Sequence, residues 1–168
     1  FIIKTLPYLP LNIVRIIARR YVAGENAEDA LKIVKELNRK GFSVTLDILG
    51  EHINDKNIAQ NITQQYYSLL YNIYDQNLNC NISIKPSHLG LDISKECIYD
   101  NLNHLIEAAK INNNFIRIDM EDSSRTDNSI ELYKKCVDKY NQIGIVLQAY
   151  LYRTENDLIE LENIKGIN

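Results

Sequence analysis

The sequence predicts an α/β fold in which parallel strands alternate with helices. Short runs rich in β-branched residues recur along the chain, and a segment with apolar residues at helical spacing follows each of them. Strict alternation of this kind implies parallel strands joined by right-handed crossovers. A doubly wound sheet is expected to carry a glycine-rich phosphate turn, but neither GxGxxG nor GxxxxGK[ST] occurs. We therefore expect a (β/α)8 TIM-type barrel, of which this chain covers about the first five β/α units.

The first two units follow an apolar opening, interrupted by two prolines, that is expected to form a leading helix over residues 1–19. Residues 20–168 then hold the β/α units of a single domain. Arg20–Gly24 is the first expected strand, and Asn26 can cap the helix that follows it. The second strand, Ser43–Leu49, leads into a long helix from about Asp55 to Gln76.

The remaining units follow the same pattern. The third, fourth and fifth strands are expected at Asn81–Lys85, Phe115–Met120 and Ile143–Tyr150, each followed by an apolar stripe at helical spacing. Thr154, with Asp157 three residues later, resembles a capping box that opens the last helix. Five strand–helix units are too few to close a barrel of eight, so we interpret the chain as a fragment.

Composition excludes several classes of protein. Among the 168 residues, 45% are hydrophobic and 24% are charged, and the net charge is −3, which is typical of a globular domain with its own core. The mild acidity and the lack of a dense Lys/Arg cluster argue against a nucleic-acid partner. Cys80, Cys97 and Cys136 lie far apart and form no CxxC, so we expect reduced thiols, no metal site and a cytoplasmic location. No uninterrupted apolar stretch of about 20 residues is present to span a membrane.

The stretch from Phe115 to Arg125 is the most informative in the chain. It begins as an apolar strand and then places three carboxylates and a methionine in four consecutive positions. Because side chains alternate along a strand, Arg117 and Asp119 share one face and Met120 lies on the other. Burying an unpaired cation or carboxylate is costly, so that face is expected to border a polar cavity. The alternative is a strand end that continues into a charged, solvent-exposed loop.

Other strands also end in polar residues. The residues at these ends are Asp47, Lys85, Asp119 and Gln148. Each alone has a structural explanation, since Asp47 can cap a loop, Lys85 can extend into solvent and Gln148 can satisfy a backbone group. In a (β/α)8 barrel, however, the carboxyl ends of the strands carry the active site. Four polar residues on one rim predict a site for anionic substrate groups and a polar cofactor.

Several segments of the chain resemble the proline dehydrogenase family, in its monofunctional bacterial form. The resemblance is carried by Ser83–Leu91, Ile116–Ser123 and Gly144–Thr154, with further matches at Arg20–Glu25 and Leu46–Glu51. It implies a flavin-dependent, distorted (β/α)8 barrel that oxidises L-proline to Δ1-pyrroline-5-carboxylate and passes electrons to a quinone. It also implies proline catabolism to glutamate, and it is compatible with peripheral contact with the inner membrane.

The resemblance further implies roles for single residues. Lys85 corresponds to the lysine that contacts the substrate, and Asp119 to the active-site aspartate. Met120 and Gln148 correspond to two positions that touch FAD. Because Met120 faces away from Asp119 on the strand, we expect its backbone to make that contact.

Two alternatives remain open. One is a class I aldolase-like lyase on the same barrel, in which Lys85 forms a Schiff base. The other is an inactive fragment that binds nothing. We also expect residues 1–168 by themselves to be poorly stable and inactive, because parallel strands need both faces covered and both sheet edges closed.

Overall fold

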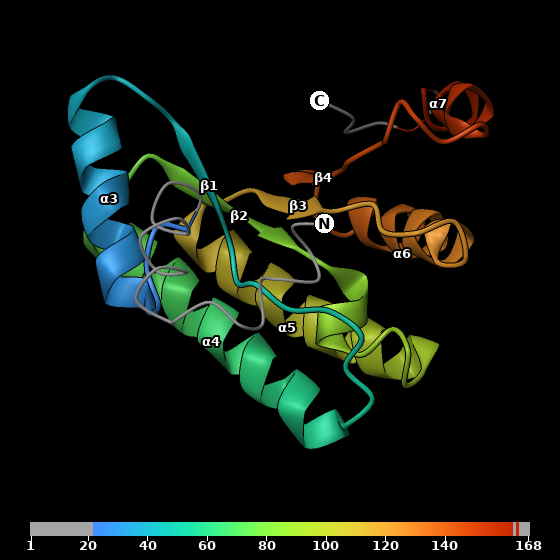
Figure 1. Ribbon diagram of the computed structural model, residues 1–168, viewed down its shortest axis with the longest axis horizontal. Coiled ribbons are helices and arrows are strands. Elements are labelled where there is room, and N and C mark those ends of the chain that lie inside the picture. Colours follow the sequence, from blue (N-terminus) through green and yellow to red (C-terminus); the bar gives the residue numbers. More distant parts are fainter. Residues whose placement is uncertain (1–21, 163, 165–168) are drawn as a thin grey trace, which may run out of the picture. The chain divides into compact units, whose positions relative to one another are not determined.

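The computed structural model describes residues 22–162 and residue 164. The chain divides into two compact units after residue 43, so the first unit is described over residues 22–43 and the second from residue 44 onward. Among the described residues, each α-helix and strand lies close to a predicted one, whereas the 3-10 helix at Pro86–Leu89 was not predicted (Figure 1 shows the elements). The elements are α3 (Ala27–Arg39), β1 (Val44–Asp47), α4 (Lys56–Asp75), β2 (Cys80–Ile84), the 3-10 helix η2 (Pro86–Leu89), α5 (Lys95–Asn112), β3 (Ile116–Ile118), α6 (Thr126–Val137), β4 (Ile143–Ile145) and α7 (Thr154–Leu161).

The first unit contains α3, which Asn26 caps as predicted by accepting a hydrogen bond from the Asp29 N–H at 2.9 Å. The strand predicted at 20–24 is wrong over its described part, because residues 22–24 are not in a strand. Gly24 lies against the start of α3, so closely that a Cβ there would come within 2.6 Å of the Asp29 Cβ. At Gly24 the chain therefore already packs against the first turn of α3. The predicted leading helix and residues 20 and 21 lie outside the described residues.

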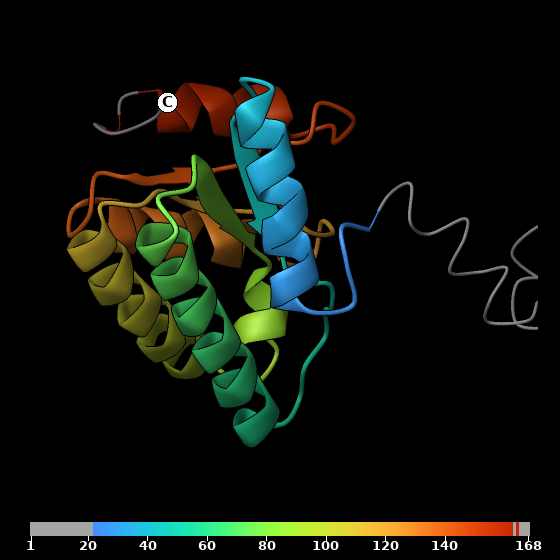
Figure 2. The same cartoon turned by 90° about the vertical axis from the view of Figure 1, so that its left-hand side faces the viewer.

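The second unit is built on a parallel sheet with the strand order β1-β2-β3-β4, which confirms the α/β class. Each strand is hydrogen-bonded to the strand next to it in the sequence, as in a barrel, whereas a doubly wound sheet reverses its order. The helices α4 and α5 pack side by side across one face of this sheet, and α6 packs against β4 and α5 (Figures 1 and 2).

The two faces of the sheet differ in chemistry. Ile82, Ile84, Ile116 and Ile118 are fully buried and alternate with polar residues along β2 and β3. On the polar face, the Thr45 hydroxyl donates to Asn81 Oδ1 at 2.8 Å, and Arg117 Nη1 donates to Thr45 Oγ1 at 3.0 Å. Since Asp47 is in register with Ser83, and Ser83 with Arg117, this polar face continues to the carboxyl ends of the strands.

Two predicted details at the C-terminal end of the chain differ from the structure. β4 ends at Ile145 rather than Tyr150, although the Val146 N–H still donates to the Ile118 carbonyl at 2.9 Å. The capping box at Thr154 and Asp157 is also wrong, because Thr154 is the first helical residue and its hydroxyl donates to the Gln148 carbonyl. The Asp157 carboxylate instead accepts from Arg153 Nε at 2.8 Å, and such a charge-assisted bond is stronger than a bond to a backbone amide.

Within the described ranges, no helix combines the length and the apolar character needed to cross a bilayer.

Candidate active site

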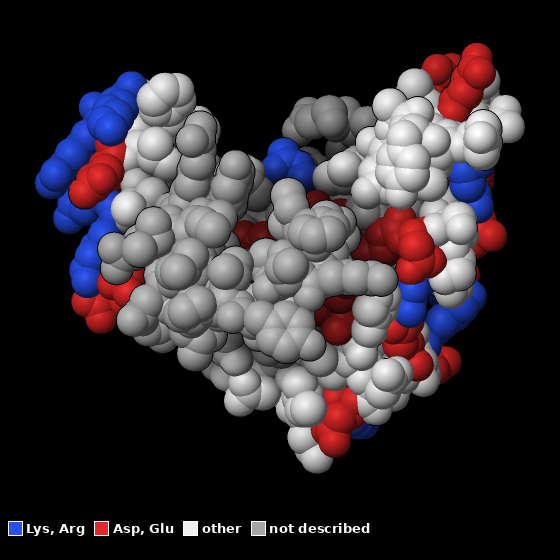
Figure 3. Space-filling model, in the orientation of Figure 1, with Lys and Arg blue, Asp and Glu red and all other residues white. Residues whose placement is uncertain are grey.

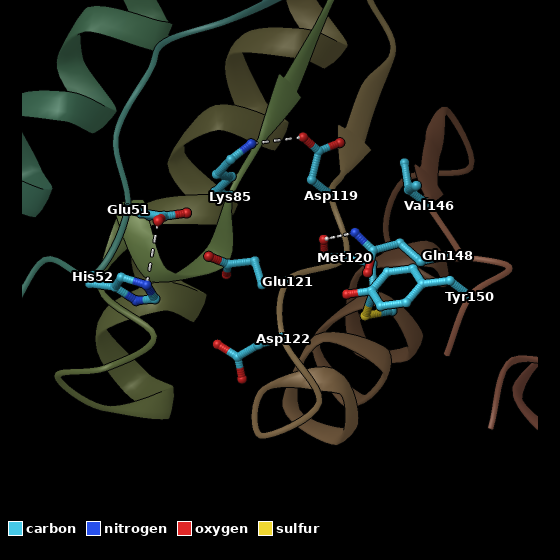
Figure 4. Close-up of a pocket in the computed structure, with 10 residues that line it drawn as sticks. All are labelled: Glu51, His52, Lys85, Asp119, Met120, Glu121, Asp122, Val146, Gln148 and Tyr150. Atoms are coloured by element: carbon cyan, nitrogen blue, oxygen red, sulfur yellow. Dashed lines mark hydrogen bonds and ion pairs between the residues drawn. The ribbon is translucent and has the colours of Figure 1, made fainter. Parts of the chain in front are cut away.

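Lys85 lies between two carboxylates at the carboxyl ends of neighbouring strands. Its Nζ is 3.2 Å from Asp47 Oδ2 and 3.2 Å from Asp119 Oδ2. The parallel register brings the three together, because Asp47 ends β1, Lys85 follows β2, and Asp119 follows β3 with its N–H still bonded to the Ile84 carbonyl. The predicted clustering of these strand-end residues is therefore confirmed (Figure 4 shows Lys85 and Asp119).

The charge of Lys85 is set by these neighbours. Burial by itself lowers the pKa of the amine, but the charges and hydrogen bonds of Asp47 and Asp119 outweigh it and hold the pKa of Lys85 above its ordinary value. The side chain is therefore an ammonium at neutral pH. A Schiff-base lysine needs a depressed pKa, so this environment counts against the lyase alternative.

Each carboxylate that binds Lys85 uses its second oxygen to accept a hydrogen bond from a hydroxyl. Asp119 Oδ1 accepts from the Ser83 hydroxyl. Asp47 Oδ1 accepts from the Tyr66 hydroxyl at 2.8 Å. Both carboxylates are thus held at two points, which fixes the direction in which they face Lys85.

A second cluster links the loops that follow the first three strands. The Ser87 N–H donates to Glu121 Oε2 at 2.8 Å, and its hydroxyl donates to the other oxygen of the same carboxylate. Ser87 Oγ also accepts from the His52 N–H at 3.0 Å, and the Ser87 carbonyl accepts from the Ile53 N–H at 3.0 Å. This cluster holds η2, and with it the backbone next to Lys85, against the adjoining loops.

Gln148 and Met120 meet on the other side of the site. Gln148 Nε2 donates to the Met120 carbonyl at 3.2 Å, so the backbone of Met120 faces Gln148 as Figure 4 shows. Gln148 Oε1 is buried and accepts no hydrogen bond from the part of the chain that is described. A buried polar atom of this kind needs a donor, and a ligand can supply one.

Lys85, Asp119, Met120, Glu121 and Gln148 border a cavity of about 510 Å³, a size typical of small-ligand sites. It is lined by Glu51, His52, Lys85, Asp119, Met120, Glu121, Asp122, Val146, Gln148 and Tyr150. Four of the ten are carboxylates, and Asp and Glu atoms are visible on the face of the molecule drawn in Figure 3. Gln148 lines this cavity and its buried Oε1 has no partner within the described residues, so the side chain fits a ligand edge that carries N–H donors, such as the polar edge of a flavin ring.

Three residues with a part in this site were not singled out from the sequence. Ser83 and Ser87 are small and polar, with no spacing that marks them. Tyr66 stands in the apolar stripe of α4, where an aromatic residue is expected to be core. Glu121 did carry a signal, because it belongs to the run of carboxylates that follows β3.

Comparison with known proteins gives consistent matches. A family model described as proline dehydrogenase matches residues 30–165. Proline dehydrogenase 2 of Bacillus subtilis (strain 168) is 35% identical over 150 residues, covering 89% of this chain and 50% of that protein. Proline dehydrogenase of Deinococcus radiodurans is 31% identical over 154 residues, with 89% and 50% covered. The chain thus spans about half the length of these curated relatives.

The fold is also found among solved structures. The crystal structure of proline utilization A (PutA) from Bdellovibrio bacteriovorus, inactivated by N-propargylglycine, matches with a TM-score of 0.81 at 24% identity. The match covers 88% of this chain and 18% of that one. This similarity confirms the predicted barrel-type architecture, of which the described sheet is a part.

Proposed function

The chain belongs to the proline dehydrogenase family, and from this premise we propose that it forms part of an active site that oxidises L-proline to Δ1-pyrroline-5-carboxylate. The single observation that carries the proposal is the ammonium of Lys85, held between Asp47 and Asp119 at the wall of the cavity.

Lys85 is the residue that binds the substrate carboxylate in this proposal. An ammonium has three N–H donors, and the two described carboxylates take two of them, which leaves the third for a ligand in the cavity. Because its pKa is raised, Lys85 stays cationic and supplies a charge-assisted hydrogen bond to the carboxylate of proline. Asp119 fixes the position of that ammonium, so the substrate is oriented before reaction.

FAD is the cofactor in this proposal, and when bound it supplies the acceptor for the hydride that leaves proline. Gln148 and the Met120 backbone are the residues of this chain that would hold it. The free Oε1 of Gln148 can accept a hydrogen bond from a ring N–H, while its Nε2 keeps it anchored to the Met120 carbonyl. The chain needs no covalent nucleophile for this chemistry.

The quinone acceptor and peripheral contact with a membrane rest on the family resemblance alone. They are tested by comparing the rate of electron transfer to a water-soluble quinone with the rate to oxygen, and by sedimenting the protein with lipid vesicles. Transfer to oxygen as fast as transfer to quinone would contradict the proposed acceptor.

Replacement of Lys85 tests the proposed role of this residue. In the protein at its full natural length, Lys85→Met should lower kcat/KM for proline about a hundredfold, because a charge-assisted bond to the substrate is lost. Lys110→Met is the matched control, since Lys110 pairs with Glu107 on the outside of α5. Equal turnover of proline by the two variants would contradict the proposal.

A further inference from the structure

Tyr66 is a buried residue of α4 whose hydroxyl reaches the end of β1. Its side chain has 0% exposure. Its oxygen accepts a hydrogen bond from the Ile48 N–H at 3.0 Å, and its hydroxyl donates to Asp47 Oδ1 at 2.8 Å. Both hydrogen-bonding functions of the phenol are therefore used at the carboxyl end of one strand.

The direction of these two hydrogen bonds is fixed by their chemistry. A backbone N–H can only donate, so the Tyr66 oxygen must accept from Ile48. The hydrogen of the phenol is then left for the Asp47 carboxylate, whose oxygens accept. Burial and the charge of Asp47 both raise the pKa of Tyr66, so the phenol keeps its proton under working conditions.

The second oxygen of Asp47 is the one that binds Lys85, at 3.2 Å. A hydroxyl that fixes Oδ1 therefore also fixes the direction in which Oδ2 faces. We propose that Tyr66 is a positioning residue of this active site: it orients the Asp47 carboxylate, which in turn holds the Lys85 ammonium at the wall of the cavity. Tyr66 itself does not line that cavity, so it acts only through Asp47.

The chain offers a matched control for this proposal. Tyr133 of α6 is equally buried, at 0% exposure, but its hydroxyl has no hydrogen-bond partner in the described part of the chain. Tyr66→Phe and Tyr133→Phe each remove one buried hydroxyl from a helix that packs on the sheet. Only the first removes a contact to the carboxylates around Lys85.

The first test measures the rate at which Lys85 is acetylated at a fixed alkaline pH, by mass spectrometry of the folded protein at its full natural length. Only a neutral amine is acetylated. In Tyr66→Phe the Asp47 carboxylate is free to turn, the ammonium loses part of its stabilisation, and Lys85 should react roughly three to ten times faster. Tyr133→Phe should leave the rate unchanged. A Tyr66→Phe protein in which Lys85 reacts at the wild-type rate would overturn the proposal.

A double-mutant cycle separates positioning from a general loss of packing. In an Asp47→Asn background, Tyr66→Phe should change the rate of Lys85 acetylation by less than about twofold, because the carboxylate through which Tyr66 acts is gone. An undiminished effect in that background would show that the phenol acts through the fold instead. Should Tyr66→Phe not fold, the ¹³Cζ NMR signal of Tyr66 provides the test: Asp47→Asn must move it, and an unmoved signal would refute the contact.

The consequence for catalysis rests on the proposed function. There, Tyr66→Phe should raise KM for proline about three- to tenfold with a smaller effect on kcat, because Lys85 is less well held for binding. Acetylation requires neither flavin nor proline, so the two proposals fail separately. Suppose that Lys85 is acetylated faster in Tyr66→Phe but the protein does not oxidise proline. That result would contradict the proposed function and support the role of Tyr66.

Discussion

The position of Lys85 depends on single oxygen atoms from two strand ends. Asp47 and Asp119 each give it one oxygen, and each has its other oxygen fixed by a hydroxyl, from Tyr66 and Ser83 respectively. Lys85, Asp47 and Asp119 are 26%, 24% and 25% exposed, so their attraction is only partly screened by water. Replacing any one of these three charged residues with an uncharged one should therefore measurably change catalysis or stability.

Asp119 and Gln148 are expected to serve different ligands. In the protein at its full natural length, Asp119→Asn keeps the size but removes the charge next to Lys85, and a charge-assisted hydrogen bond contributes roughly 1.5–3 kcal/mol. The catalytic efficiency with proline should fall about ten- to a hundredfold while flavin content stays the same. Gln148→Ala should instead change the flavin spectrum or its occupancy. Loss of flavin from Asp119→Asn, with normal proline turnover per bound flavin, would show that this division of roles is wrong.

The stability of the protein at its full natural length should depend on alkaline pH through Lys85. Its folded-state pKa is raised, so its contribution is fully present below the ordinary value of 10.5 and is lost as pH rises through the folded-state pKa. At neutral pH, Lys85→Met should lower the free energy of unfolding by about 1–2 kcal/mol, because two carboxylates lose their counter-charge. Urea unfolding at increasing pH should show this difference shrinking above pH 10.5. A difference that stays constant would contradict the ion-pair explanation.

Residues of the site could be predicted from the sequence only where their type was unexpected for the local pattern. Asp47, Lys85 and Asp119 interrupt or end apolar strands, and the parallel register then brings them together. Tyr66 gave no such signal, because an aromatic residue in an apolar stripe looks the same whether its hydroxyl is bonded or not. What the phenol contacts is decided by how α4 packs on the sheet, which periodicity does not specify.

At the scale of elements, the loop after β1 and the segment after β2 lie in close contact with each other. Gly50 has φ +153°, and a Cβ there would come within 2.4 Å of Nε2 of the buried His88. The 3-10 helix that contains His88 follows Lys85 directly and ends at Leu89, before Gly90, which adopts φ +103°. The loop after β1 and the segment after β2 therefore constrain each other.

Gly50→Ala should destabilise the protein by roughly 2–4 kcal/mol, because it adds a steric clash with His88 to backbone strain. Gly41→Ala is the control, since Gly41 also has a positive φ, +87°, but a Cβ there would meet nothing within 4 Å. Gly41→Ala should lower the free energy of unfolding by only about 1 kcal/mol. Thermal unfolding of both variants, in the protein at its full natural length, measures the difference, and equal melting temperatures would contradict the close contact.

Elements with an extended periodic or apolar pattern were predicted well, whereas two predictions from short local signals were wrong. The long helix predicted from about Asp55 to Gln76 is α4, which matches to within one residue at each end. The strand predicted at 20–24 is wrong over residues 22–24 because Gly24 packs on α3, and the predicted capping box is wrong because Arg153 binds Asp157. In both cases a contact with a neighbouring residue overrode a short local signal.

At the scale of the whole molecule, the described sheet has two edges. β1 and β4 each pair with only one strand within the described residues. A parallel sheet is stable when both faces are covered and its edges are closed, and the chain spans about half the length of its curated relatives. We therefore expect residues 1–168 by themselves to associate or unfold without cooperativity. Size-exclusion chromatography and thermal unfolding measure this, and a cooperatively melting monomer would contradict it.

The central claim is that Lys85 and its two carboxylates bind proline beside a flavin. It is tested most directly by mixing the FAD-loaded protein, at its full natural length, with L-proline in the absence of oxygen and following the flavin absorbance. The account predicts that L-proline bleaches the flavin of the wild-type protein and that Lys85→Met, with the same flavin content, is bleached about a hundredfold more slowly at limiting proline. A flavin that stays oxidised in the wild-type protein, or that L-proline reduces equally fast in Lys85→Met, would contradict it.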